Sequence, residues 1–131
     1  MFTLLKNAHV YAPHSLGKKD LLLCADKIVA IEDSITALPF PTDTIDCQGK
    51  ILTPGLIDQH IHLIGGGGEA GFNSRTPQVT LSNLIKGGLT TVVGVMGTDG
   101  ISRTPKDLYA KAKALEIEGI RTFMHTGSYE L

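Results

Sequence analysis

With 131 residues, of which 42% are hydrophobic and 19% charged, the chain has the composition of a folded globular protein, not of a disordered or coiled-coil segment. Twelve Lys and Arg residues nearly balance thirteen Asp and Glu residues, which gives a net charge of −1. This balance argues against binding to nucleic acid or to an anionic membrane surface. By length alone, the chain is expected to form one domain.

Targeting and membrane segments are not expected. The N-terminal apolar run is too short for a signal peptide, and no stretch approaches the ~20 apolar residues of a membrane-spanning helix. Cys24 and Cys47 lack a C-x-x-C spacing and are expected to be buried free thiols. Together these features predict a cytoplasmic protein.

The first 52 residues are expected to form a small β-domain. Short β-type runs alternate there with turn-forming segments, which is typical of a small antiparallel sheet or half-sandwich. One of the turns is predicted at Lys6-Asn7. The predicted strands are 2–5, 8–11, 21–24, 27–31, 44–47 and 50–52.

From residue 53 onward the pattern changes to alternating strands and helices. The strands are predicted at 56–63, 89–96 and 120–124, and the helices at 77–86 and 105–118. A Ser-Arg-Thr-Pro sequence precedes each helix, so Thr76 and Thr104 are expected to cap the two helices. Buried strands connected by helices predict a parallel sheet with right-handed crossovers.

A pair of histidines is the first candidate for chemistry. His60 and His62 stand two residues apart on a predicted strand, so both rings share a face with Asp58 and lie close enough to bind one divalent metal ion. Such a pair fits a structural role equally well. The Gly-rich loop after the strand favours the metal site, because sites in α/β sheets lie beyond the carboxyl ends of the strands.

Other residues near this loop have interpretations that involve no substrate. Asp99 is expected to stabilise the turn at 97–100, and Arg75 and Arg103 are expected at exposed positions where the helices begin. The glycines at 65–68 lack the Lys and Ser/Thr of a P-loop, which argues against a phosphate site.

The segment TPGLIDQHIH at 53–62 resembles the Pro-Gly-x-Ile-Asp-x-His-x-His motif of the amidohydrolase superfamily. Within that superfamily, segments 63–71, 97–103 and 126–129 look most like the isoaspartyl (β-aspartyl) dipeptidases. The resemblance implies an α/β fold: the first part of a TIM-like (β/α)8 metal-dependent hydrolase barrel over 53–131, preceded by the small β-sheet or β-sandwich domain at 1–52. Both domains would be incomplete, because closure of a barrel requires strands beyond those seen here.

The resemblance also assigns roles to single residues. His60 and His62 match two ligands of a binuclear zinc site, whose remaining ligands come from later strands. Four further positions match residues that act on the substrate: Glu69 (binding of the free α-amino group), Gly67 and Thr98 (substrate contact) and Tyr129 (polarisation of the scissile carbonyl).

The activity implied is zinc-dependent hydrolysis of the β-linked amide of isoaspartyl dipeptides, by a family whose full-length members form homo-oligomers. Since only two metal ligands are matched, the 131-residue chain alone is expected to hold zinc weakly and to be inactive. Two alternatives stay open. One is another amidohydrolase, such as a dihydroorotase-like cyclic amidase or an N-acyl amino acid deacylase. The other is a non-catalytic, truncated fragment that acts as a binding or assembly module.

Overall fold

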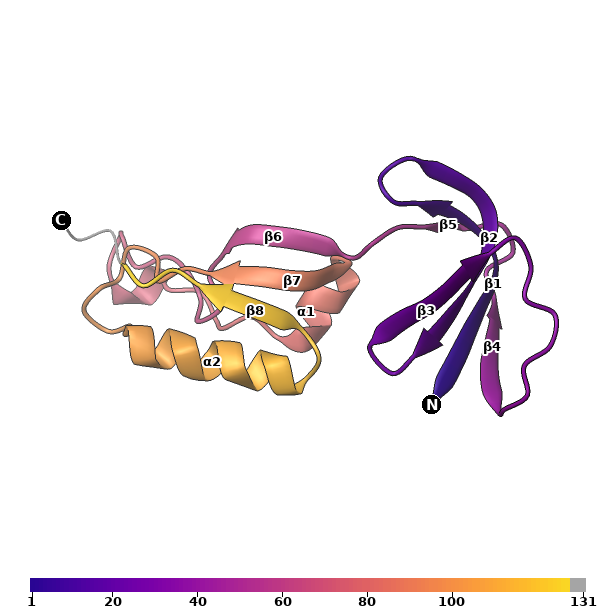
Figure 1. Cartoon of the computed structure of the whole chain (residues 1–131). Coiled ribbons are helices and arrows are strands. Elements are labelled where there is room, and N and C mark those ends of the chain that lie inside the picture. Colours follow the sequence, from indigo (N-terminus) through magenta and orange to yellow (C-terminus); the bar gives the residue numbers. More distant parts are fainter. Residues whose placement is uncertain (128–131) are drawn as a thin grey trace. The chain divides into compact units, whose positions relative to one another are not determined.

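The computed structural model describes residues 1–127 and divides into two units, Met1–Pro54 and a second unit that begins at Gly55 (Figure 1). Across these residues, no helix combines the length and the apolar character that a membrane span requires. Cys24 and Cys47 are free thiols as predicted, but both are only partly buried.

The first unit is a five-stranded mixed sheet. Strands β1 (Phe2–Tyr11), β2 and β3 form an antiparallel meander, as predicted. The prediction is wrong for β4 (Thr42–Asp46) and β5, which pair with β1 in parallel. The reason is the connection at 33–41, which crosses over instead of turning back and brings β4 alongside β1 in the same direction. The strands are β1 (Phe2–Tyr11), β2 (Ser15–Cys24), β3 (Lys27–Glu32), β4 (Thr42–Asp46) and β5 (Ile51–Leu52).

The turn predicted at Lys6-Asn7 is a β-bulge inside one long strand. The register of β1 against β2 shifts between Leu5 and Ala8, and Asn7 has a φ of 58°. Asp20 on β2 is 3% exposed and accepts hydrogen bonds from the backbone N–H groups of Asn7 (2.8 Å) and Ile35 (2.9 Å). One buried carboxylate therefore fastens both the bulge and the crossover segment to the sheet.

Replacing Asp20 with Asn is expected to lower the free energy of unfolding by about 1–3 kcal/mol at pH 7, because an amide cannot accept from both N–H groups without turning its NH₂ toward one of them. The Ile35 N–H, the Asn7 N–H and the Lys6 ammonium lower the pKa of Asp20 against the opposing effect of burial.

A lowered folded-state pKa means that the carboxylate stabilises the sheet above about pH 4, and that this contribution is lost as the pH falls through the folded-state pKa. Thermal unfolding followed by circular dichroism should therefore show a difference between wild type and D20N that shrinks from pH 7 toward pH 3. A difference that is constant with pH would contradict this assignment.

The second unit has the predicted order of strands and helices. Its three strands form a parallel sheet in the order β6-β7-β8, with helices in the connections (Figure 1). The elements are β6 (Leu56–Ile61), η1 (Phe72–Ser74), α1 (Leu81–Lys86), β7 (Leu89–Gly94), α2 (Pro105–Ile117) and β8 (Arg121–Met124). The buried core between sheet and helices consists of Leu63, Ile64, Leu84, Val92, Met96, Leu108, Ala112, Leu115 and Ile120.

The two helices begin differently, although the same four residues precede each predicted start. Thr104 caps α2 as predicted and accepts a hydrogen bond from the N–H of Asp107 at 3.2 Å. The prediction for Thr76 is wrong, because α1 begins four residues later with Thr80 in a capping box with Asn83. Thr76 instead bonds the Gly-rich loop after β6, where its hydroxyl accepts from the N–H of Gly66 at 2.8 Å.

Candidate functional site

The histidine pair lies where β6 ends. His60 is the penultimate residue of the strand and His62 follows its last residue. Their ring centroids are 5.6 Å apart and the ring planes meet at 56°. The structure thus brings the two imidazoles together, with His60 exposed and His62 half-buried.

The pair fits a zinc site in part. Imidazole is a preferred zinc ligand, and rings this close can approach a common ion. Within residues 1–127, no group of three or more His, Cys, Asp and Glu side chains is placed to hold a metal. The Asp58 carboxylate accepts a hydrogen bond from the backbone N–H of His60 at 2.9 Å. The described residues therefore supply two of the four ligands that a tetrahedral zinc ion requires.

Two glycines lie against the ring of His62. A Cβ on Gly66 would lie 2.3 Å from Nδ1 of His62, which is far inside van der Waals contact. A Cβ on Gly97, in the loop after β7, would lie in ordinary contact at 3.5 Å from Nε2 of His62, and the φ of +76° is what favours glycine at this position. The ring is therefore flanked by the loops that follow two neighbouring strands. The glycine run was visible in the sequence, but nothing there indicated that Gly66 packs against His62.

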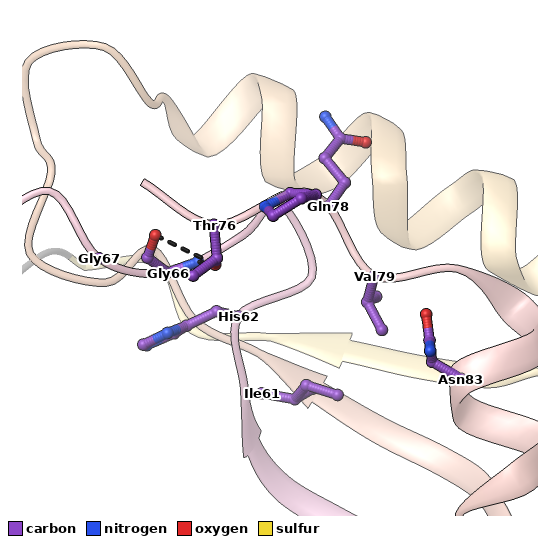
Figure 2. Close-up of a pocket in the computed structure, with 9 residues that line it drawn as sticks. Ile61, His62, Gly66, Gly67, Thr76, Gln78, Val79 and Asn83 are labelled. Carbon is purple, nitrogen blue, oxygen red and sulfur yellow. Dashed lines mark hydrogen bonds between the residues drawn. The ribbon is translucent and has the colours of Figure 1, made fainter. Parts of the chain in front are cut away.

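A cavity of about 570 Å³ adjoins His62. Figure 2 shows the residues around it, including the bond between Gly66 and Thr76. One part of the lining comes from the end of β6 and the Gly-rich loop, and the other from the segment that leads into α1. The lining residues are Ile61, His62, Gly66, Gly67, Thr76, Pro77, Gln78, Val79 and Asn83.

Two of the predicted substrate residues touch each other. The Thr98 hydroxyl donates to Oε1 of Glu69 at 2.8 Å, although the residues are 29 positions apart. The Glu69 backbone N–H and the Thr98 hydroxyl lower the pKa of the Glu69 carboxyl, and the nearby His62 and Arg103 act in the same direction. Glu69 is exposed and ionised, which is the state that binds an ammonium group.

Gly67, the third predicted substrate residue, stands two residues before Glu69. Its φ is +72°, and a Cβ there would lie 2.4 Å from the carbonyl oxygen of Ser74, so the backbone at this position requires glycine. Tyr129 lies outside the described residues.

Asp99 stabilises the turn after β7, as predicted. Its Oδ1 accepts from the N–H groups of Ile101 (3.2 Å) and Ser102 (2.9 Å), and the Ser102 hydroxyl donates to Oδ2. The Ser102 hydroxyl and N–H, together with Arg75, lower the pKa of Asp99 despite its burial. Both oxygens of the Asp99 carboxylate therefore accept hydrogen bonds within this turn.

The two arginines are not simply surface residues at helix starts. Arg75 is exposed as predicted, but it precedes the first residue of α1 by six positions, and its Nε lies 3.3 Å from Oδ2 of Asp99. The prediction for Arg103 is wrong: it is 1% exposed, and its guanidinium donates to the carbonyl oxygens of Gly66 and Gly67. Local sequence did not reveal this role, because its partners lie 36 and 37 residues away.

Known proteins share both the sequence and the fold. A beta-aspartyl dipeptidase from Fervidobacterium islandicum AW-1, solved in complex with the beta-Asp-Leu dipeptide, is 49% identical with a TM-score of 0.92, over 98% of this chain and 34% of that one. A dihydroorotase from Pediococcus pentosaceus is 32% identical over 98% of this chain and 28% of the relative. An L-hydantoinase from Arthrobacter aurescens, at 20% identity and a TM-score of 0.61 over 97% of this chain and 28% of that one, shares the fold.

The chain thus spans between 28% and 34% of the length of these relatives. The model of the amidohydrolase family matches residues 43–109, which include the histidine pair, the Gly-rich loop and Glu69. This match covers half of the chain, and the similarity to the dipeptidase extends over nearly all of it. The chain therefore belongs to the amidohydrolase family.

Proposed function

We propose that this chain forms the N-terminal part of a (β/α)8-barrel enzyme that hydrolyses β-aspartyl dipeptides. The observation that carries the proposal is the ionised Glu69, bonded to Thr98 in the loop beside the histidine pair. The 49% identity to a beta-aspartyl dipeptidase supports it. Assembly into a homo-oligomer and a cytoplasmic location belong to the same proposal.

Glu69 is suited to recognise the aspartyl end of such a substrate. In a β-aspartyl dipeptide the α-amino group is free and cationic, because the peptide bond is made through the side-chain carboxyl. A carboxylate whose pKa is lowered remains ionised over the whole neutral range and can bond this ammonium. Thr98 fixes the orientation of the carboxylate, and the positive φ of Gly67 shapes the loop that presents it.

His60 and His62 would hold part of the metal centre. Zinc bound there would polarise the scissile carbonyl and lower the pKa of a water molecule toward ~7. The ring of His62 lies against Gly66 and Gly97 at the end of β6. We assign to Tyr129 a hydrogen bond to the oxygen of the scissile carbonyl, where negative charge develops.

A second candidate is a cyclic amidase. The curated relative at 32% identity over 98% of the chain is a dihydroorotase, which favours this alternative. The ring of dihydroorotate carries no ammonium group, so an enzyme with this substrate has no cation for Glu69 to bind. The two candidates therefore differ in what they require of this one side chain.

Replacing Glu69 with Gln is expected to raise KM for β-Asp-Leu at least about 10-fold, because a hydrogen bond between two charged groups is lost, while kcat changes little. Steady-state kinetics of the whole enzyme, of which this chain is proposed to form the N-terminal part, with β-Asp-Leu and with dihydroorotate, measure this. Glu118→Gln is the matched control, since Glu118 is an exposed residue at the end of α2. A wild-type protein that hydrolyses dihydroorotate but not β-Asp-Leu supports the cyclic amidase, and an unchanged KM in E69Q refutes the role of Glu69.

A further inference from the structure

Arg103 is a buried cation whose partners are main-chain carbonyls. Nη1 donates to the oxygen of Gly67 and Nη2 to the oxygen of Gly66, both at 3.0 Å. Asp99 contributes a carboxylate 3.9 Å from Nη1. Nε is buried and has no hydrogen-bond partner among the described residues. The two carbonyl bonds and the nearby carboxylate therefore offset part of the cost of burying the guanidinium at 1% exposure.

The carbonyls that face Arg103 belong to a loop whose N–H groups are also fixed. The N–H of Gly66 donates to the Thr76 hydroxyl at 2.8 Å, and that of Gly68 donates to the Ser74 hydroxyl at 3.1 Å. The backbone of this loop is therefore held by hydroxyl groups on one side and by the guanidinium on the other. A run of four glycines has many conformations of similar energy, so these bonds select one of them.

The selected conformation sets the position of three functional groups. In this conformation Gly67 has its positive φ, the Glu69 carboxylate accepts the hydrogen bond from Thr98, and Gly66 lies against the ring of His62. Two contacts therefore connect the segment after β6 with the segment after β7. They are the bond from Arg103 to the carbonyl of Gly66 and the hydrogen bond from Thr98 to Glu69.

We propose that Arg103 is a positioning residue, whose paired bonds to the carbonyls of Gly66 and Gly67 keep the Gly-rich loop in its substrate-binding shape. The expected change in KM rests on the proposed function, whereas the expected effect on the loop rests on the fold alone. Lysine cannot make the same pair of hydrogen bonds as the planar guanidinium group, because its ammonium is a point charge on a flexible chain.

Arg103→Lys is expected to raise KM for β-Asp-Leu about 10-fold with kcat within about 2-fold of wild type, since only the fraction of molecules with a competent loop binds substrate. Amide hydrogen exchange at Gly66 and Gly68 is expected to accelerate by a similar factor. The exchange of β7 amides should stay unchanged. Both measurements use the whole enzyme of which this chain is proposed to form the N-terminal part. Arg103→Met, which lacks the charge and all donors, should show the larger effect.

Asp20→Asn is the control, since it also removes a buried charge but lies in the other unit. It should lower the melting temperature while KM and loop exchange stay at wild-type values. A purely structural role for Arg103 predicts that R103K, like D20N, lowers the melting temperature and leaves KM and loop exchange at wild-type values. That result would overturn the proposal. A loss of kcat at constant KM would also overturn it. If the wild type has no activity on β-Asp-Leu, the proposed function fails, and unchanged exchange in the loop then separately refutes the role of Arg103.

Discussion

Replacing His62 with Ala should lower kcat/KM for β-Asp-Leu by more than about 100-fold and reduce the zinc content of the purified protein. Mutation of a residue that only hydrogen-bonds to a metal ligand typically lowers metal affinity or activity about 10- to 100-fold. Loss of a ligand itself should therefore lower kcat/KM by more than this. His62 is the better target of the pair, because it is half-buried and lies against Gly66 and Gly97, whereas His60 is exposed. The measurements are metal analysis by mass spectrometry and steady-state kinetics.

His14→Ala is the control for this experiment. His14 is an exposed histidine just before β2, in the other unit, and should be silent in both measurements. The alternative left open by the sequence, a structural role for the H-x-H pair, predicts a lower melting temperature for H62A with zinc content unchanged. That result would remove the metal site from the proposed function.

The parts of the fold that were predictable depend on short-range chemistry. Helix α2 begins where Thr104 and Pro105 place its start, because capping involves residues within one turn. The strands β7 and β8 lie within the segments where they were predicted, 89–96 and 120–124, and the histidine pair follows from the alternation of side chains along a strand. In each case the information lies within a few residues.

The features that were missed depend on contacts between distant segments. Thr76 looks like a helix cap, but it bonds Gly66, and Thr80 with Asn83 caps the helix instead. Arg103 precedes a helix and is charged, which suggests exposure, but its partners belong to a loop after another strand. A single sequence contains no information about such pairings unless a family resemblance provides it.

The pairing of Glu69 with Thr98 illustrates that distinction. Spacing and composition leave Glu69 as one loop carboxylate among others, and only the resemblance to the dipeptidases selected it together with Thr98. The structure adds that the two are hydrogen-bonded and that the carboxyl has a lowered pKa.

The second large effect is expected at Gly66. A Cβ at this position would lie 2.3 Å from Nδ1 of His62, so either the backbone or the ring must move. The backbone is held by Thr76 at its N–H and by Arg103 at its carbonyl, which leaves the ring as the part that yields. Gly66→Ala should therefore displace the imidazole and lower kcat/KM by roughly 100-fold, the usual penalty for a catalytic group moved by an ångström.

Gly87→Ala separates this effect from the general cost of changing a glycine. Gly87 ends α1 with a φ of −79°, and a Cβ there would meet nothing closer than 3.4 Å, so alanine fits without strain. Both variants add one methyl group to the same unit, but only G66A should lose activity and bind less zinc. Wild-type kinetics in G66A would show that His62 tolerates displacement, which a metal ligand in a fixed donor set cannot do. The glycine next to the ring thus tests the metal site without altering either histidine.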